Sequence, residues 1–139
     1  AVMRTSLWLC CLVVIPLGIG CSRGPRLYPV AGKVQFKDGT PVSFGRLECL
    51  ADANRAVSRA EIGRDGSFRL GTHKPGDGAV AGRHAVILLQ TVVTPSKETS
   101  HRAHGRMVSR HYGRYESSGL ILNVDPEGRN DAVVIRLAE

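Results

Sequence analysis

Residues 30–41 read Val-Ala-Gly-Lys-Val-Gln-Phe-Lys-Asp-Gly-Thr-Pro. From Val30 to Phe36 every second residue is apolar or glycine, and the residues between them are small or polar. A period of two residues is typical of a β-strand with one face in the core. Asp38-Gly39 then provides a turn, and Pro41 has no backbone N–H to continue the pairing. The stretch predicts a strand that is followed by a tight turn.

Six further stretches carry strand signals of the same kind. They are residues 44–51, 56–62, 67–70, 82–93, 120–124 and 133–137. Residues 82–93 form the most apolar run outside the N-terminus and predict a central strand. The turn Gly63-Arg64-Asp65-Gly66 separates two alternating stretches and predicts a hairpin. No segment keeps the period of 3.6 residues that an amphipathic helix needs.

Length and composition agree with one β-rich domain. The chain has 139 residues, and its 16 Gly and 7 Pro are spread as turn signals between short strands. Seven short strands at this spacing predict an all-β domain over residues 27–139, a seven-stranded Greek-key β-sandwich, with a small barrel as the second interpretation.

Several turn-and-strand motifs resemble those of a known domain family. They are Tyr28–Val34 with Lys37–Val42, Ile62–Phe68 with its Asp-Gly-Ser-Phe turn, Gly76–Val80 with Gly82–His84, and Ser117–Leu120. Together they resemble carboxypeptidase regulatory-like, transthyretin-like (Ig-like) domains, in a subset found as small bacterial lipoproteins. The resemblance implies a sandwich of about seven strands and no agreed activity.

The N-terminus predicts export. Arg4 precedes a nearly apolar stretch over residues 7–19, which is too short for a membrane-spanning helix and suits a signal peptide over residues 1–20. Gly20-Cys21 resembles the processing site of bacterial lipoproteins, in which the cysteine receives diacylglycerol and fatty acids such as palmitate. We therefore expect Cys21 to be lipidated, residues 21–26 to be a tether, and the domain to be extracytoplasmic, periplasmic or at the cell surface. An ordinary secretory signal and an uncleaved anchor are the alternatives.

Cysteine and histidine usage limits the chemistry. Cys10 and Cys11 lie in the predicted signal and Cys21 takes lipid, so Cys49 remains as a predicted buried structural thiol without a disulfide. His101, His104 and His111 share one segment and could hold a metal ion, but arginines surround them. We expect no metal and no cofactor. The chain also lacks a Gly-x-Ser-x-Gly elbow, a phosphate-binding glycine loop and a His-x-x-Glu pair, so no catalysis is expected.

Positive charge is the most informative surface feature. The net charge is +7, and residues 97–114 carry five basic residues against one acidic residue. The candidate contacts for an anionic partner are Arg102, Arg106, Arg110 and Arg114. Export argues against nucleic acid and favours lipid headgroups, an acidic polysaccharide or an acidic protein. We expect a binding or structural module of the cell envelope; the alternative is a secreted metal-binding or enzyme-accessory domain that uses residues 97–114.

Overall fold

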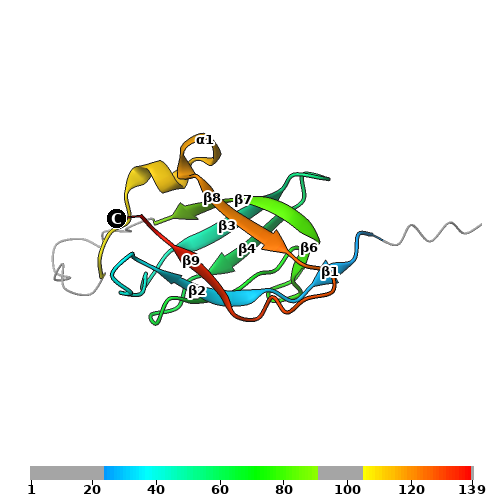
Figure 1. The fold of residues 1–139 in the computed structure, drawn as a ribbon, viewed down its shortest axis with the longest axis horizontal. Helices are drawn as coiled ribbons and strands as arrows, with labels where there is room; N and C mark the ends of the chain where they lie inside the picture. Colours follow the sequence, from blue (N-terminus) through cyan, green and yellow to red (C-terminus); the bar gives the residue numbers. More distant parts are fainter. Residues whose placement is uncertain (1–23, 91–104, 139) are drawn as a thin grey trace, which may run out of the picture.

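The computed structural model describes residues 24–90 and 105–138. Strands dominate this part of the chain, with one single-turn 3-10 helix, η1, and one four-residue helix, α1 (Figure 1). The elements are β1 (Leu27–Tyr28), β2 (Ala31–Gln35), β3 (Arg46–Ala51), β4 (Val57–Glu61), β5 (Ser67–Arg69), β6 (Ala79–Val80), β7 (Gly82–Leu89), η1 (Arg110–Gly113), α1 (Tyr115–Ser118), β8 (Leu120–Val124) and β9 (Val133–Arg136). The all-β prediction is confirmed.

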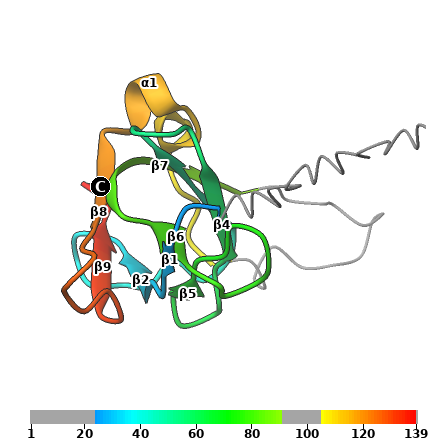
Figure 2. The same cartoon turned by 90° about the vertical axis from the view of Figure 1, so that its right-hand side faces the viewer.

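The strands form three sheets. Four strands are arranged in the order β4-β3-β7-β8, three in the order β5-β2-β9, and β1 pairs with β6 alone. Figure 2 shows β9, β2 and β5 as the lower layer, while β8, β7 and β4 arch over it. β7 lies between β3 and β8, as expected for a central strand, although it ends at Leu89 and residues 91–93 of the predicted strand lie outside the described residues.

The predicted strands match the seven longer strands of the structure. β1 and β6, of two residues each, were not predicted because two residues carry no periodicity. β2 runs antiparallel to β5 and parallel to β9, so the first and last of the longer strands lie side by side.

One core lies between the two larger sheets. The burial of β3 and β4 alternates as the sequence predicts, with Ser58 and Ala60 inside and Arg59 and Glu61 outside. Val34 from the three-stranded sheet joins side chains of the four-stranded sheet in a single apolar cluster. The two inner faces therefore share one core, which is how stacked sheets remove apolar surface from water.

The predicted hairpin over residues 56–70 is wrong. β4 and β5 belong to different sheets, and the turn between them carries the chain from one sheet to the other. Gly63 N donates to Ser67 O (2.8 Å), and Arg59 and Gly71 form one isolated antiparallel bridge, but no ladder joins the two strands. A turn within a hairpin and a turn between two sheets have the same local residue pattern. Only the pairing of each strand with distant strands distinguishes them.

Residues 94–118 carry neither a strand nor a helix signal in the sequence, which predicts one long loop between the strands at 82–93 and 120–124. This prediction is wrong in its second half. Residues 110–118 form η1 and α1, and Tyr112 and Ser118 are buried there. The Tyr112 hydroxyl accepts a hydrogen bond from Ala138 N (2.8 Å), while Ser118 Oγ donates to Val86 O (2.6 Å). These two contacts attach the segment to the end of the chain and to β7.

Candidate functional site

The cationic segment predicted from the sequence is only partly a free surface. Arg102 lies outside the described residues, as does Cys21. Arg110 is the exposed first residue of η1, and Arg114 is exposed between η1 and α1. The structure therefore places Arg110 and Arg114 on neighbouring turns of one ordered segment.

Arg106 has a structural role instead. Its guanidinium lies over the Phe36 ring, 4.1 Å from Cζ to the centroid, and Nη1 donates to Asp38 Oδ2 (3.1 Å). Phe36 is fully buried, so Arg106 closes the core above it and holds the turn after β2. The Thr40 backbone N–H, followed by the Thr40 hydroxyl, holds the pKa of Asp38 below its ordinary value, and Arg106 adds to this effect. No local sequence pattern indicates the contact between Arg106 and Asp38, because 68 residues separate them.

Tyr115 attaches the same segment to the outer face of the four-stranded sheet. Its hydroxyl donates to Glu48 Oε1 (2.9 Å), and Arg59 Nε donates to Glu48 Oε2 (2.8 Å). Burial, and next the hydrogen bond to Glu48, raise the pKa of the Tyr115 hydroxyl, so it remains protonated and able to donate. Residues 105–118 are thus fixed by contacts at several points.

The other candidate side chains are Cys49 and the three histidines of residues 101–111. Cys49 is fully buried and unpaired; burial raises the pKa of its thiol to about 12 and the Glu48 carboxylate adds to this, so the thiol is unreactive at neutral pH. Its prediction as a buried structural thiol is confirmed. His111 Nδ1 pairs with Ser109 Oγ (2.8 Å), while His101 and His104 lie outside the described residues. Within 24–90 and 105–138, no three His, Cys, Asp or Glu side chains are grouped for a metal ion.

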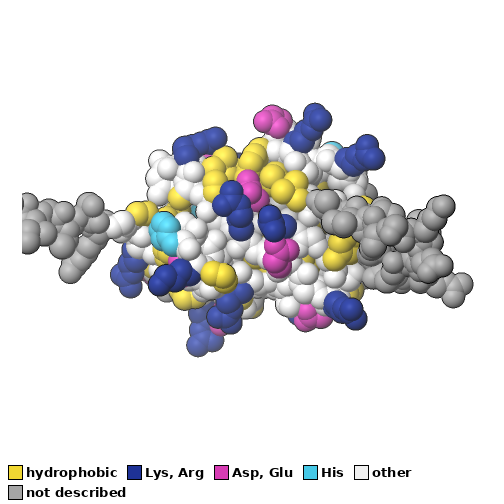
Figure 3. Space-filling model, turned by 180° about the vertical axis from the view of Figure 1, so that it is seen from behind, with side chains coloured by type: hydrophobic (Ala, Val, Ile, Leu, Met, Phe, Trp, Pro, Cys, Tyr) yellow, Lys and Arg dark blue, Asp and Glu magenta, His cyan; other side chains and the backbone are white. Residues whose placement is uncertain are grey.

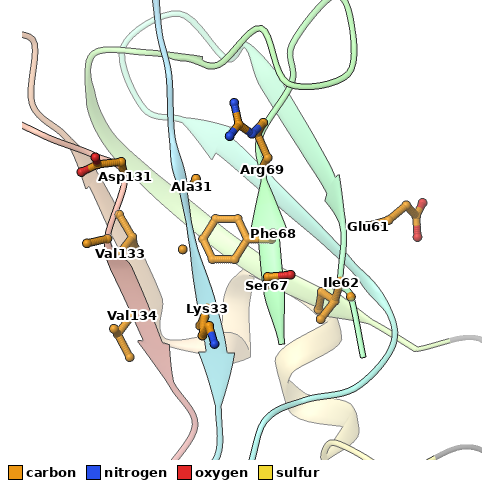
Figure 4. A pocket seen from close by; sticks show the side chains of 13 residues that line it. Ala31, Lys33, Glu61, Ile62, Ser67, Phe68, Arg69, Asp131, Val133 and Val134 are labelled. Atoms are coloured by element: carbon orange, nitrogen blue, oxygen red, sulfur yellow. The ribbon is translucent and has the colours of Figure 1, made fainter. Parts of the chain in front are cut away.

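One groove of the described part lies beside β5 and β2. It has a volume of about 760 Å³, and small residues of β2 line it next to Phe68. Figure 4 shows Lys33, Glu61, Arg69 and Asp131 around its margin, pointing away from one another. Side chains that diverge in this way do not form a set that could act together on one substrate atom.

A second groove, of about 710 Å³, adjoins the first and shares Glu61 and Arg69 with it. It lies between the outer face of β4 and residues 71–76, and its lining includes Arg46, Arg59 and Lys74. No sequence pattern indicates this groove, because its cations come from separate segments of the chain. Seen from behind, where β4 and β5 lie, the surface carries interleaved Lys/Arg and Asp/Glu side chains (Figure 3).

Comparisons with known proteins found no matching family model, no matching curated protein and no matching solved structure. Among the described helices, none has the length and apolar character needed to cross a membrane.

Proposed function

We propose that this chain is a lipid-anchored, extracytoplasmic binding or structural module of the cell envelope that performs no catalysis. Its domain would be a Greek-key β-sandwich of the transthyretin-like kind, attached through Cys21. The shared core between two stacked sheets and the parallel pairing of β2 with β9 support this assignment.

The observation that carries the proposal is the position of the cationic segment relative to the predicted tether. β1 begins at Leu27, six residues after Cys21, and lies at one end of the domain, whereas η1 lies toward the other end (Figure 1). Six extended residues reach at most about 20 Å, so the β1 end would be held next to the membrane.

Arg110 and Arg114 would then be directed away from that membrane. β7 alone has eight residues and spans about 26 Å, which is well beyond the screening length of about 8–10 Å at physiological salt. Attraction to the headgroups beneath the domain would be screened at this distance. The arrangement favours an anionic polymer of the envelope, such as an acidic polysaccharide, over the lipid surface itself.

Anchoring is tested by metabolic labelling with a fatty-acid analogue. Cys21→Ala should abolish labelling and leave unprocessed precursor, while Cys11→Ser, which changes a cysteine of the predicted signal, should label like the wild type. Normal labelling of the Cys21→Ala protein would overturn the anchoring proposal.

Partner binding is tested on immobilised polygalacturonate. Arg110→Ser/Arg114→Ser should weaken retention, and added salt should weaken retention of the wild type. Arg110→Lys/Arg114→Lys keeps both charges and is the matched control. If neither the serine substitutions nor added salt changes the retention, the electrostatic role of this segment is refuted.

A further inference from the structure

One wall of the groove between β4 and residues 71–76 is the turn over residues 71–78, whose backbone is held by hydrogen bonds within the turn. Asp77 accepts hydrogen bonds from the backbone N–H groups of Thr72 (2.6 Å), His73 (3.1 Å) and Lys74 (2.9 Å). Thr72 Oγ1 in turn donates to Gly78 O (2.7 Å). The turn is therefore closed by its own side chains, and the exposed side chains of His73 and Lys74 extend from a fixed backbone.

The same turn is hydrogen-bonded to β4, which forms the other side of the groove. Arg59 and Gly71 exchange two backbone hydrogen bonds, of 2.8 and 2.9 Å, between β4 and the start of the turn. A side chain at Gly71 would collide with the backbone of Lys74, so the turn packs too tightly for any residue larger than glycine. A ligand in this groove would meet a surface that needs little ordering on binding.

Only some of the cations that line the groove have a carboxylate partner within the described residues. Arg46 pairs with Glu61 (2.7 Å), and Arg59 pairs with Glu48 (2.8 Å). The side chains of Arg69 and Lys74, by contrast, make no ion pair and donate no hydrogen bond to any group among residues 24–90 and 105–138. The aliphatic stem of Arg69 lies close to Gly76, which leaves its guanidinium at the junction of the two grooves.

The size and chemistry of the groove limit its ligand. A volume of about 710 Å³ is in the range of small-molecule sites, about 300–1,000 Å³. The lining contains no Phe, Tyr or Trp on which a nucleobase could stack. A guanidinium binds the two oxygens of a carboxylate or phosphate in a fork, and a lysine ammonium supplies a second point charge.

From these observations we infer that the groove binds an acidic sugar unit, with the carboxylate or phosphate held by Arg69 and Lys74. This site is separate from the Arg110 and Arg114 segment and does not depend on Cys21. It goes beyond the proposed function, which assigns no ligand to this part of the surface.

The test is an NMR titration of the ¹⁵N-labelled full chain, kept in neutral detergent, with glucuronate, glucose 6-phosphate, glucose and inorganic phosphate. The two acidic sugars should shift the amide signals of Gly71 and Gly76 and the Nε–H signal of Arg69, and glucose should not. The two acidic sugars also distinguish carboxylate from phosphate as the preferred anion. Equal shifts with glucose, or binding of inorganic phosphate as strong as that of both sugars, would overturn the assignment of an acidic sugar.

Two charge-matched double variants test the location. Arg69→Ser/Lys74→Ser should weaken acidic-sugar binding about tenfold or more, because two charge-assisted contacts are lost. Arg110→Ser/Arg114→Ser removes the same charge from residues outside the lining of the groove and should leave this binding unchanged. Equal weakening in both variants would show a general charge effect and refute the site. Loss of polygalacturonate retention in the Arg110 and Arg114 variant alone would concern only the proposed function.

Discussion

Replacement of Arg106 by alanine should destabilise the domain, whereas the same change at Arg110 or Arg114 should not. The Arg106 guanidinium lies 4.1 Å from the centroid of the Phe36 ring, and Phe36 is fully buried. Arg110 and Arg114 are exposed on η1 and beside it. Each of the three substitutions removes one positive charge from the same segment. A difference in stability among the three variants therefore does not come from the loss of charge alone.

The magnitude follows from the stacked contact. A cation–π pair contributes about 0.5–1 kcal/mol when exposed and about 2 kcal/mol when it is desolvated. The Arg106 side chain is 47% exposed, so its contribution lies between these limits, at about 1–1.5 kcal/mol. The ion pair with Asp38 adds little, because both partners are in contact with water. Arg110→Ala and Arg114→Ala should stay within about 0.5 kcal/mol of the wild type.

The assay is urea unfolding of the purified chain at low and at high salt. We expect a lower midpoint for Arg106→Ala with an unchanged slope, and most of the difference should persist in 1 M NaCl, where an exposed ion pair is screened. Asp38→Asn keeps the stacked arginine and should have a smaller effect. A midpoint for Arg106→Ala equal to that of Arg110→Ala would refute the role of Arg106 in closing the core.

Three other predictions concern the core, a turn and acid stability. Tyr112→Phe should cost about 0.5–1.5 kcal/mol in urea unfolding, because the bond from Ala138 N is lost, while Tyr112→Ala should cost about 3–5 kcal/mol; equal costs would contradict this. Gly66→Ala should cost at least about 2 kcal/mol, since φ is +80° and the new Cβ would lie 2.5 Å from Val34 O; an unchanged thermal midpoint would refute the argument. The hydroxyl and then the backbone N–H of Ser67 hold the pKa of Asp65 below its ordinary 3.8, so its stabilising contribution is complete above pH 3.8 and is lost as the pH falls through the folded-state value. Asp65→Asn should therefore flatten the acid limb of the stability–pH curve, and an unchanged limb would contradict this.

Much of the local structure could be predicted from the sequence. The alternation over residues 30–36 and 56–62 separates the two faces of each strand, and Val34, Ser58 and Ala60 lie on the buried faces, because side chains on a strand point to opposite faces in turn. The Asp38-Gly39 pair also predicted a turn. The structure has this turn, and Gly39 adopts a φ of +86°, which favours glycine. Burial of Cys49 followed from the same alternation.

The tertiary structure decided which segments meet, and with them the role of Arg106 and the groove that Arg69 and Lys74 line. The residues around Gly63 look like a hairpin turn, yet the strands on either side pair with partners far away in the sequence. Arg106 is one of the arginines of a basic segment and contacts Phe36, while Arg69 and Lys74 lie in no basic run and line a groove without an ion pair in the described part of the chain. Periodicity is a property of neighbouring residues and fixes which face of a strand is buried. Strand pairing and side-chain contacts across the fold depend on the free energy of the whole packed domain, which no local pattern contains.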